Sequence, residues 1–288
     1  MLLTRLTLTL HLQKPLVFTC FPGFYLRNAL VKAMTVHCRN QLRKREQMVT
    51  DCKGCKYTSH CIYYRLNLPV MEPEEKPGVM PFRIEAGELI TGKYQQGDVT
   101  FGMTLFGHAA EHIDELRDAW VRIGSEYGLG DEGADRSFTV GKEMAIQVEN
   151  SEDILTREYP ETNRLSLQFR HLRLSQKKME TKPVLPFQEL INQIMLRLHA
   201  LGDAYGEENL RTGLSEADNL SAGDITHEER WVLCNYQYPG NRQGYWFLNG
   251  QSVYKGHLSP FLPLLHLGSQ TGIGRFTSYG FGNYIIKV

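Results

Sequence analysis

A run of glycines near the C-terminal end restricts what that part of the chain can become. Five glycines fall within fifteen residues, in the pattern G-x3-G-x-G-x5-G-x-G from Gly268 to Gly282. Glycine has no Cβ, so it adopts positive φ at little cost and lets its main chain approach another group closely. Two interpretations are open. Successive exposed N–H groups would form a concave site for an anion such as phosphate, or the glycines would mark a bend between packed strands.

Length and charge distribution set the next limits. A chain of 288 residues with 42% hydrophobic residues can form one large domain or two ordinary ones. The net charge is zero, but the segment 27–65 is basic, and only Glu46 and Asp51 oppose its positive charge. Such a segment is typical of a phosphate-binding surface, although a solvated helix face would look the same. It contains nine basic residues: Arg27, Lys32, Arg39, Arg43, Lys44, Arg45, Lys53, Lys56 and Arg65.

The N-terminal pattern and the cysteines indicate the compartment. Leu6, Leu8 and Leu10 alternate with polar residues, which predicts a half-buried strand rather than a signal peptide. No stretch reaches the roughly 20 apolar residues of a membrane helix. We therefore expect a cytoplasmic protein without a membrane partner. Six cysteines in a reducing compartment are weak support for disulfides.

The order of the expected elements is close to βαββαβ, twice. In the first half we expect strands near 3–12, 81–88, 98–106 and 137–148, with helices at 25–45 and 112–127. A polar segment at 150–163 contains Pro160 and separates the halves. In the second half we expect strands near 164–174, 231–238 and 244–248, a helix at 187–205, a helical segment at 258–267 and a final strand at 284–286. The predicted domains are 1–155, with a cysteine-containing insertion at about 46–80, and 156–288.

Four cysteines have the look of metal ligands. Cys52, Cys55 and Cys61 follow the spacing C-x2-C-x5-C, and Cys38 lies upstream, with His60 as a further candidate ligand. A structural zinc ion needs four nitrogen or sulfur ligands in a tetrahedron. The four thiols would supply them; the alternative is a set of reduced, buried thiols.

His37 is the first candidate for catalysis. Gln41 and Lys44 follow it at i+4 and i+7, so all three lie on one side of the predicted helix. A histidine can act as general acid or base near neutral pH, and a lysine can stabilise developing negative charge. The alternatives are a packed core histidine or a zinc ligand beside Cys38. His266 is a rival candidate, and His11 and His108 are weaker ones.

Taken in order, several segments resemble the RAMP superfamily of CRISPR-associated proteins. The glycine-rich end resembles that superfamily's hallmark loop, with Arg275 where a lysine is expected after the first glycine pair. Most of the chain resembles the branch that processes precursor crRNA, the sixth Cas family. The matching segments are 23–30, 63–66, 81–82, 165–169, 186–191, 197–201, 241–243, 248–250 and 258–265.

The resemblance implies an α+β protein of two tandem ferredoxin-like units and an endoribonuclease that needs no metal for catalysis. The 2′-hydroxyl of the RNA would attack the adjacent phosphorus, which leaves a 2′,3′-cyclic phosphate and a 5′-hydroxyl. The protein would then retain the 3′ hairpin of the crRNA. The implied partners are precursor crRNA and other Cas proteins, with no small-molecule substrate. The alternative is a non-catalytic RAMP subunit that binds guide RNA. The family pattern does not fix the catalytic residues, but it adds Tyr25 to His37 and Lys44.

The predicted RNA-binding residues are basic residues and members of the glycine-rich segment. Phe276, Tyr279 and Phe281 could stack on bases, although core packing is expected for at least two of them. The full set is Arg27, Arg39, Arg43, Arg242, Gly272, Gly274, Arg275, Ser278, Gly280 and Gly282.

Overall fold

The computed structural model describes residues 1–44, 52, 55–58, 61–67, 79–86, 89–130, 137–141, 144–174, 184–205, 214, 224–237 and 244–287. The side chains of residues 37, 39–44, 65 and 67 lie outside this description. The chain divides into two compact units. The N-terminal unit is Arg5–Gln147, and the C-terminal unit is Val148–Val288 together with Met1–Thr4. The predicted domain boundary at 155 lies a few residues beyond this division.

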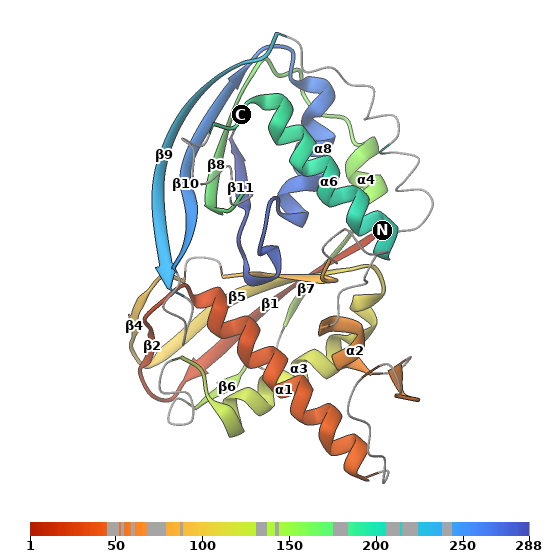
Figure 1. The fold of residues 1–288 in the computed structure, drawn as a ribbon, viewed down its shortest axis with the longest axis vertical. Helices are drawn as coiled ribbons and strands as arrows, with labels where there is room; N and C mark the ends of the chain where they lie inside the picture. The colour runs from red at the N-terminus through yellow and green to blue at the C-terminus, as the bar shows by residue number, and fades with distance from the viewer. Residues whose placement is uncertain are drawn as a thin grey trace. The chain divides into compact units, whose positions relative to one another are not determined.

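The N-terminal unit has the order β-α-β-β-α-β within a larger set of elements (Figure 1). Its sheet runs β3-β5-β1-β6, so the last strand lies beside the first, and β7 also pairs with β1. This is the ferredoxin-like arrangement. The main elements are β1 (Leu2–Leu12), α1 (Pro22–Lys44), β3 (Phe82–Glu85), β5 (Gly97–Phe106), α3 (Ile113–Arg122), β6 (Phe138–Val140) and β7 (Ala145–Asn150).

Alternating leucines place β1 in the middle of this sheet. Leu6, Leu8 and Leu10 are buried, while the two threonines between them are half-buried. Side chains of a strand alternate between its two faces, so the leucines form one apolar face. Phe101 and Trp120 are also buried in this unit, with ring centroids 4.8 Å apart. The predicted half-buried strand is therefore present, and it forms part of the core.

Some elements of this unit were not expected from the sequence. A small sheet pairs β2 (Leu16–Phe18) with β4 (Gly92–Tyr94), and α2 (Ile62–Asn67) lies in the cysteine-containing insertion. The predicted helix at 112–127 is a 3-10 turn (Gly107–His112), α3 and a π-helical turn (Ile123–Tyr127). The predicted strand at 137–148 is two strands, β6 and β7.

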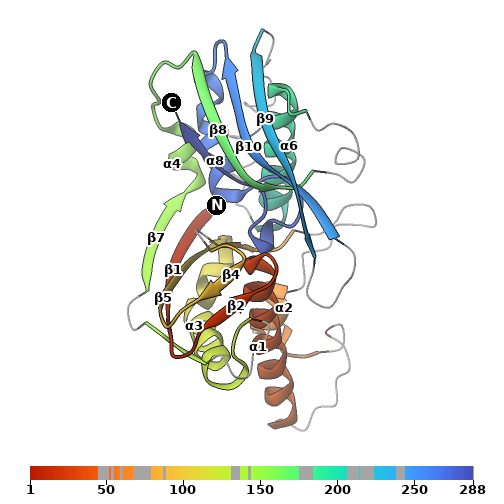
Figure 2. The ribbon, with the colours of Figure 1, turned by 90° about the vertical axis from the view of Figure 1, so that its left-hand side faces the viewer.

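The C-terminal unit repeats the same order (Figure 2). Its sheet runs β11-β8-β10-β9, and the last strand again lies beside the first. The helices α6 and α8 lie together on one face of that sheet (Figure 1). The elements are β8 (Arg164–Leu172), α6 (Phe187–Tyr205), β9 (Thr226–Gln237), β10 (Gly244–Lys255), a 3-10 turn (Ser259–Phe261), α8 (Leu262–Thr271), a 3-10 turn (Thr277–Tyr279) and β11 (Asn283–Lys287). The prediction of two ferredoxin-like units is confirmed.

A short helix, α4 (Ser151–Thr156), lies where an irregular polar segment was predicted. The Asn150 side chain accepts a hydrogen bond from the Glu152 N–H at 3.1 Å and caps the helix. Glu152 and Asp153 carry negative charge in its first turn, where it is favourable. The sequence did contain this start signal. Among the described helices, none is long and apolar enough to cross a membrane.

Candidate functional site

The glycine-rich loop, residues 272–282, links α8 to β11 through left-handed main chain. Gly272, Gly274, Gly280 and Gly282 have φ values of 73°, 74°, 92° and 74°. These conformations cost a residue with a Cβ free energy and cost glycine little. Gly268 differs, because it lies within α8 and its missing Cβ makes room for Tyr284 Oη.

The loop is closed by main-chain hydrogen bonds. Ile273 N–H donates to the Gly282 carbonyl at 3.1 Å, and Gly282 N–H donates to the His171 carbonyl at 2.9 Å. Gly272 N–H donates to Gly268 at 2.8 Å, and Gly280 N–H donates to Thr277 at 2.9 Å. Three of the glycine N–H groups are therefore used inside the protein. The predicted anion site made of successive glycine N–H groups does not form from them.

Close packing explains the glycines better. A Cβ on Gly282 would overlap the carbonyl oxygen of Ile273, and a Cβ on Gly274 would overlap the carbonyl oxygen of Arg173. Main-chain atoms of this kind cannot move aside as a flexible side chain can. The alternative interpretation, a bend between packed segments, therefore fits the structure.

Solvent reaches only part of the loop. Gly272, Ser278, Gly280 and Gly282 are buried, whereas Arg275 is exposed. Gly274, Phe276 and Tyr279 are half-buried, and Phe281 is fully buried. Arg275 and its immediate neighbours are thus the part of the loop that can contact a ligand.

Aromatic rings surround the loop. Phe281 contacts Phe247 with ring centroids 5.6 Å apart, and Phe247 stacks on Tyr236 at 4.5 Å. Phe276 contacts Tyr245 at 5.3 Å and Tyr279 at 5.9 Å. The rings therefore pack against one another, as the sequence predicted for at least two of the three loop aromatics.

The end of β8 carries a histidine that the sequence analysis did not select. His171 has a positive φ of 55° although it is not a glycine. The centre of its ring lies 5.2 Å from that of Phe247. Its main-chain N–H donates a hydrogen bond to Asn249 Oδ1 at 2.7 Å. Burial, and then the charge of Arg170, lower the pKa of His171 to about 4. The imidazole is therefore neutral near pH 7.

A break in the apolar alternation could have revealed this site. Leu165, Leu167 and Phe169 are buried at a spacing of two residues, but the next buried leucine is Leu172. A one-residue shift in such a pattern is the sign of a β-bulge.

The predicted catalytic residues lie along α1. The Tyr25 hydroxyl lies 3.0 Å from Thr19 Oγ1, and its ring lies 5.3 Å from Phe18. Tyr25 is buried in this contact, with 8% of its surface exposed. His37 follows twelve residues later on the same helix, which is about 18 Å at 1.5 Å per residue. The helix therefore does not bring Tyr25 and His37 to one phosphate.

His37 and Lys44 lie on the same side of α1. They are seven residues apart on α1, which is two turns and about 10 Å along one side of the helix. Arg39 and Arg43 belong to the same helical segment, but the side chains of all four residues lie outside the description. Arg27 is half-buried nearer the start of α1.

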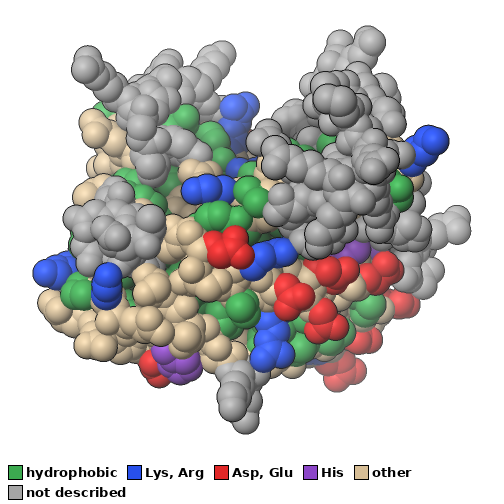
Figure 3. Space-filling view, turned by 90° about the horizontal axis from the view of Figure 1, so that it is seen from below, with side chains coloured by type: hydrophobic (Ala, Val, Ile, Leu, Met, Phe, Trp, Pro, Cys, Tyr) green, Lys and Arg blue, Asp and Glu red, His purple; other side chains and the backbone are tan. Residues whose placement is uncertain are grey.

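The surface view adds information on charge. Acidic side chains gather on one side of the face seen from below, and lysine and arginine side chains are scattered over it (Figure 3). The described residues on this face therefore form no continuous basic surface. Arg242 lies outside the described residues.

Three further cysteines lie near Cys38 and affect the pKa of its thiol. Burial raises the pKa of the Cys38 thiol to about 12, with further contributions from Cys61, which hydrogen-bonds to it, and from Cys52 and Cys55. The four thiols thus lie in one region, as reduced cysteines. Among the described residues, however, no three histidine, cysteine or acidic side chains are arranged to hold a metal ion. The zinc site stays a prediction, and His60 lies outside the described residues.

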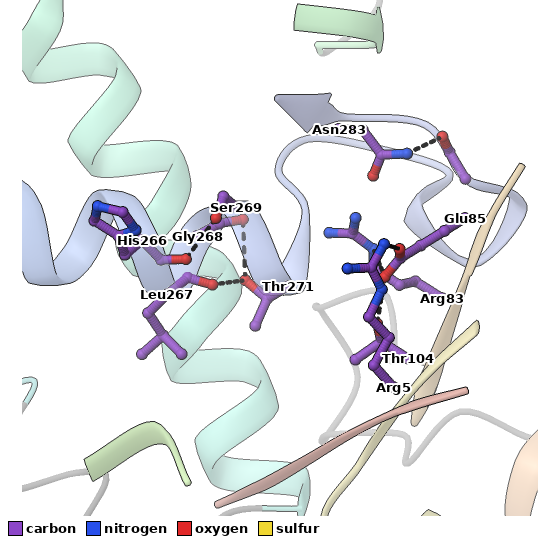
Figure 4. Close-up of polar contacts among 11 residues, drawn as sticks. Arg5, Arg83, Glu85, Thr104, His266, Leu267, Gly268, Ser269, Thr271 and Asn283 are labelled. Atoms are coloured by element: carbon purple, nitrogen blue, oxygen red, sulfur yellow. Dashed lines mark hydrogen bonds and ion pairs between the residues drawn. The ribbon is translucent and has the colours of Figure 1, made fainter. Parts of the chain in front are cut away.

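The other histidines have structural contacts. His266, on α8, stacks on Tyr159 with ring centroids 4.6 Å apart. Burial, and then Arg157, lower its pKa. His11 is exposed, with Nδ1 2.6 Å from Asp98 Oδ1, and His108 is half-buried. Figure 4 shows the His266 carbonyl accepting a hydrogen bond from Ser269 Oγ at 2.7 Å.

An ion cluster around the buried carboxylate of Glu85 lies on the N-terminal sheet (Figure 4). Glu85 Oε2 lies 2.7 Å from Arg5, and its Oε1 accepts a hydrogen bond from Thr104 at 2.5 Å. Burial alone would raise the pKa of Glu85, but Arg83, Thr104 and Arg5 together lower it. This carboxylate is neutralised by its neighbours and joins no second carboxylate in the described structure.

Two family models match consecutive parts of the chain. A model described as an N-terminal domain matches residues 1–167, and the model of the CRISPR-associated endoribonuclease Cas6 matches residues 167–284. The second match contains the end of β8, the aromatic rings and the whole glycine-rich loop. No curated protein matches the sequence.

Solved structures share the fold at low sequence identity. A Thermus thermophilus Cas6 in a product complex has a TM-score of 0.56 at 12% identity, with 99% of each chain covered. A second Cas6 product complex has a TM-score of 0.52 at 16% identity, with 100% of each chain covered. A partial Cas6-RT-Cas1–Cas2 complex has a TM-score of 0.50 at 14% identity, covering 99% of this chain and 46% of that one.

Proposed function

We propose that this chain, which belongs to the Cas6 family of CRISPR-associated endoribonucleases, cuts precursor crRNA within its repeats without using a metal ion. The observation that carries this proposal is the Cas6 match across residues 167–284, which contains the glycine-rich loop with exposed Arg275. Two Cas6 proteins solved in product complexes share its fold, which supports the assignment to RNA processing.

The reaction would use a nucleophile that belongs to the RNA. The 2′-hydroxyl oxygen forms a bond to the adjacent phosphorus, and the bond from phosphorus to the leaving 5′ oxygen breaks. A base takes the proton of the 2′-hydroxyl, and an acid gives a proton to the 5′ oxygen. The products are a 2′,3′-cyclic phosphate and a 5′-hydroxyl. DNA lacks the nucleophile, so only RNA can react.

His37 is the residue that we assign to proton transfer. Its imidazole can act as base or acid near neutral pH, and Lys44 lies two turns away on α1, where a long cationic side chain can stabilise negative charge at the phosphate. Tyr25 is too far along the helix to join them. We assign it to the packing of α1 on Phe18 and Thr19.

Arg275 is the residue that we assign to RNA binding with most support from geometry. It is exposed in a loop whose other residues are buried or half-buried, and arginine is well suited to phosphate oxygens. We further propose that the protein keeps the 3′ hairpin of its product, associates with other Cas proteins and acts in the cytoplasm.

The test uses purified protein and cognate repeat RNA in EDTA. We expect cleavage in EDTA, with a 2′,3′-cyclic phosphate on the upstream fragment. A matched RNA with one 2′-deoxy nucleotide at the cut site should bind with equal affinity and stay intact. Cutting of the deoxy RNA would exclude the mechanism. Tight binding of the all-ribose RNA without cleavage would favour the alternative, a non-catalytic RAMP subunit.

A further inference from the structure

The end of β8 contains a bulge that turns Arg173 toward the glycine-rich loop. Along β8 and β10, Leu172 lies opposite Leu248, but Phe169 lies opposite Gly250, so one residue is inserted on β8. Asn249 fills the irregular position by accepting the His171 N–H at 2.7 Å. A bulge bends its strand and re-aims the side chains that follow it.

Arg173 connects β10 to the loop. Its Nη1 donates a hydrogen bond to the Trp246 carbonyl at 2.7 Å. Its guanidinium carbon lies 5.1 Å from the ring centre of Tyr245 and 5.4 Å from that of Phe276. Only 8% of Arg173 is exposed. We call Arg173, Tyr245 and Phe276 the arginine clamp.

The clamp acts on a strained part of the loop. Phe276 has a positive φ of 63°, which is rare for a residue with a bulky side chain. Such a conformation persists when surrounding contacts hold it. The cation and the neighbouring ring of Tyr245 supply these contacts, because arginine is attracted to aromatic faces.

The main chain of Arg275 is fixed on both sides as a result. Its N–H donates to the Arg173 carbonyl at 2.8 Å, and the next residue, Phe276, is held by the clamp. Its own side chain is exposed. Burial lowers the pKa of Arg173, and the charge of Arg275 lowers it further, so the two cations are near neighbours.

We propose that Arg173 is a positioning residue for RNA binding, which holds Arg275 ready to contact a phosphate of the substrate. This inference rests on the proposed function. A residue whose main chain is already fixed loses less conformational freedom on binding, so the RNA is held more tightly. Two adjacent cations also attract an anion more strongly than one does.

Lysine cannot replace Arg173 in this role. It keeps the positive charge, but it lacks the planar group that stacks on two rings while donating to Trp246. Arg173→Lys therefore tests the contacts that position the loop while it keeps the positive charge. Arg164→Lys is the matched control, because Arg164 is exposed at the first position of β8, and Arg173 directly follows the last residue of that strand.

The experiment measures affinity for the uncleavable 2′-deoxy repeat RNA in a double-mutant cycle of Arg173→Lys and Arg275→Ala. We expect Arg173→Lys to weaken binding about 10-fold in the wild-type background and at most about 2-fold in the Arg275→Ala background, because both changes remove the same contact. Arg164→Lys should bind as wild type. In single-turnover cleavage of all-ribose RNA, Arg173→Lys should raise the RNA concentration that gives the half-maximal rate by about 10-fold.

Three results would overturn the proposal. Equal losses in both backgrounds would show that Arg173 acts independently of Arg275, and wild-type affinity of Arg173→Lys would show that it has no role in binding. If circular dichroism shows that Arg173→Lys is unfolded, Phe276→Leu decides by the same two criteria. Failure of wild-type protein to bind repeat RNA would overturn the proposed function, and this inference with it.

Discussion

Replacing Gly282 should test how the glycine-rich loop is built. Gly282 has a φ of 74°, and a Cβ there would overlap the carbonyl oxygen of Ile273. Alanine at this φ costs about 1–2 kcal/mol for the conformation alone. The overlap can be relieved only if the main chain at Gly282 moves away from that at Ile273. That movement would break the hydrogen bonds Ile273–Gly282 and Gly282–His171.

Each broken hydrogen bond costs about 0.5–1.5 kcal/mol. We therefore expect Gly282→Ala to destabilise the C-terminal unit by about 2–5 kcal/mol. The sequence alone predicted Gly282 only as an RNA-binding residue. The structure indicates that folding suffers first, and RNA binding suffers as a consequence.

Chemical denaturation followed by tryptophan fluorescence would measure the effect, since Trp231 and Trp246 lie in this unit. Gly256→Ala is the control. Gly256 also has positive φ, at 145°, but the atom nearest to a Cβ there is the side-chain atom Cγ1 of Ile225, at 3.0 Å, and the nearest main-chain atom lies at 3.3 Å. If the free energy of unfolding of Gly282→Ala lies within about 1 kcal/mol of the values for both Gly256→Ala and wild type, then no close main-chain contact exists at Gly282.

Three more predictions concern single residues. His37→Ala should slow single-turnover cleavage by about 10²–10⁴-fold with nearly unchanged RNA affinity; normal cutting by this variant together with loss in His266→Ala would transfer the role. Metal analysis should find one zinc per chain that is lost in Cys52→Ser and Cys55→Ser, and metal-free wild-type protein would end that proposal. His171 has a pKa of about 4 when folded, against 6.5 ordinarily, so the unfolded chain takes up a proton that the folded protein excludes. Stability should therefore fall by about 3 kcal/mol as the pH drops from 6.5 to 4. His171→Asn, which tolerates positive φ, should remove that part of the decline, and an unchanged pH profile would refute the assignment.

Periodic patterns predicted the frame of this protein well. The helix expected at 187–205 is found as α6 (Phe187–Tyr205), and the strand expected at 98–106 is found as β5 (Gly97–Phe106). Both depend on local alternation or on a helical period, which short stretches of sequence carry by themselves. The two βαββαβ units follow from the order of such elements.

The arrangement around the loop could not be predicted in the same way. Arg173 is one of many arginines in the sequence, and its role depends on Tyr245 and Phe276, which are distant along the chain. His171 follows a strand pattern until the phase shift after Phe169, a signal that was present and missed. Burial and cross-strand contacts, rather than residue type, set these two residues apart.

The position of β11 has a consequence for synthesis. β11 pairs with β8, the first strand of the C-terminal unit, and Gly282 directly before β11 carries the hydrogen bonds that close the loop. Pairing of strands so far apart in sequence is slow and must await the last residues of the unit. A nascent chain in which β11 has not yet emerged from the ribosome therefore lacks the hydrogen bonds that close the glycine-rich loop.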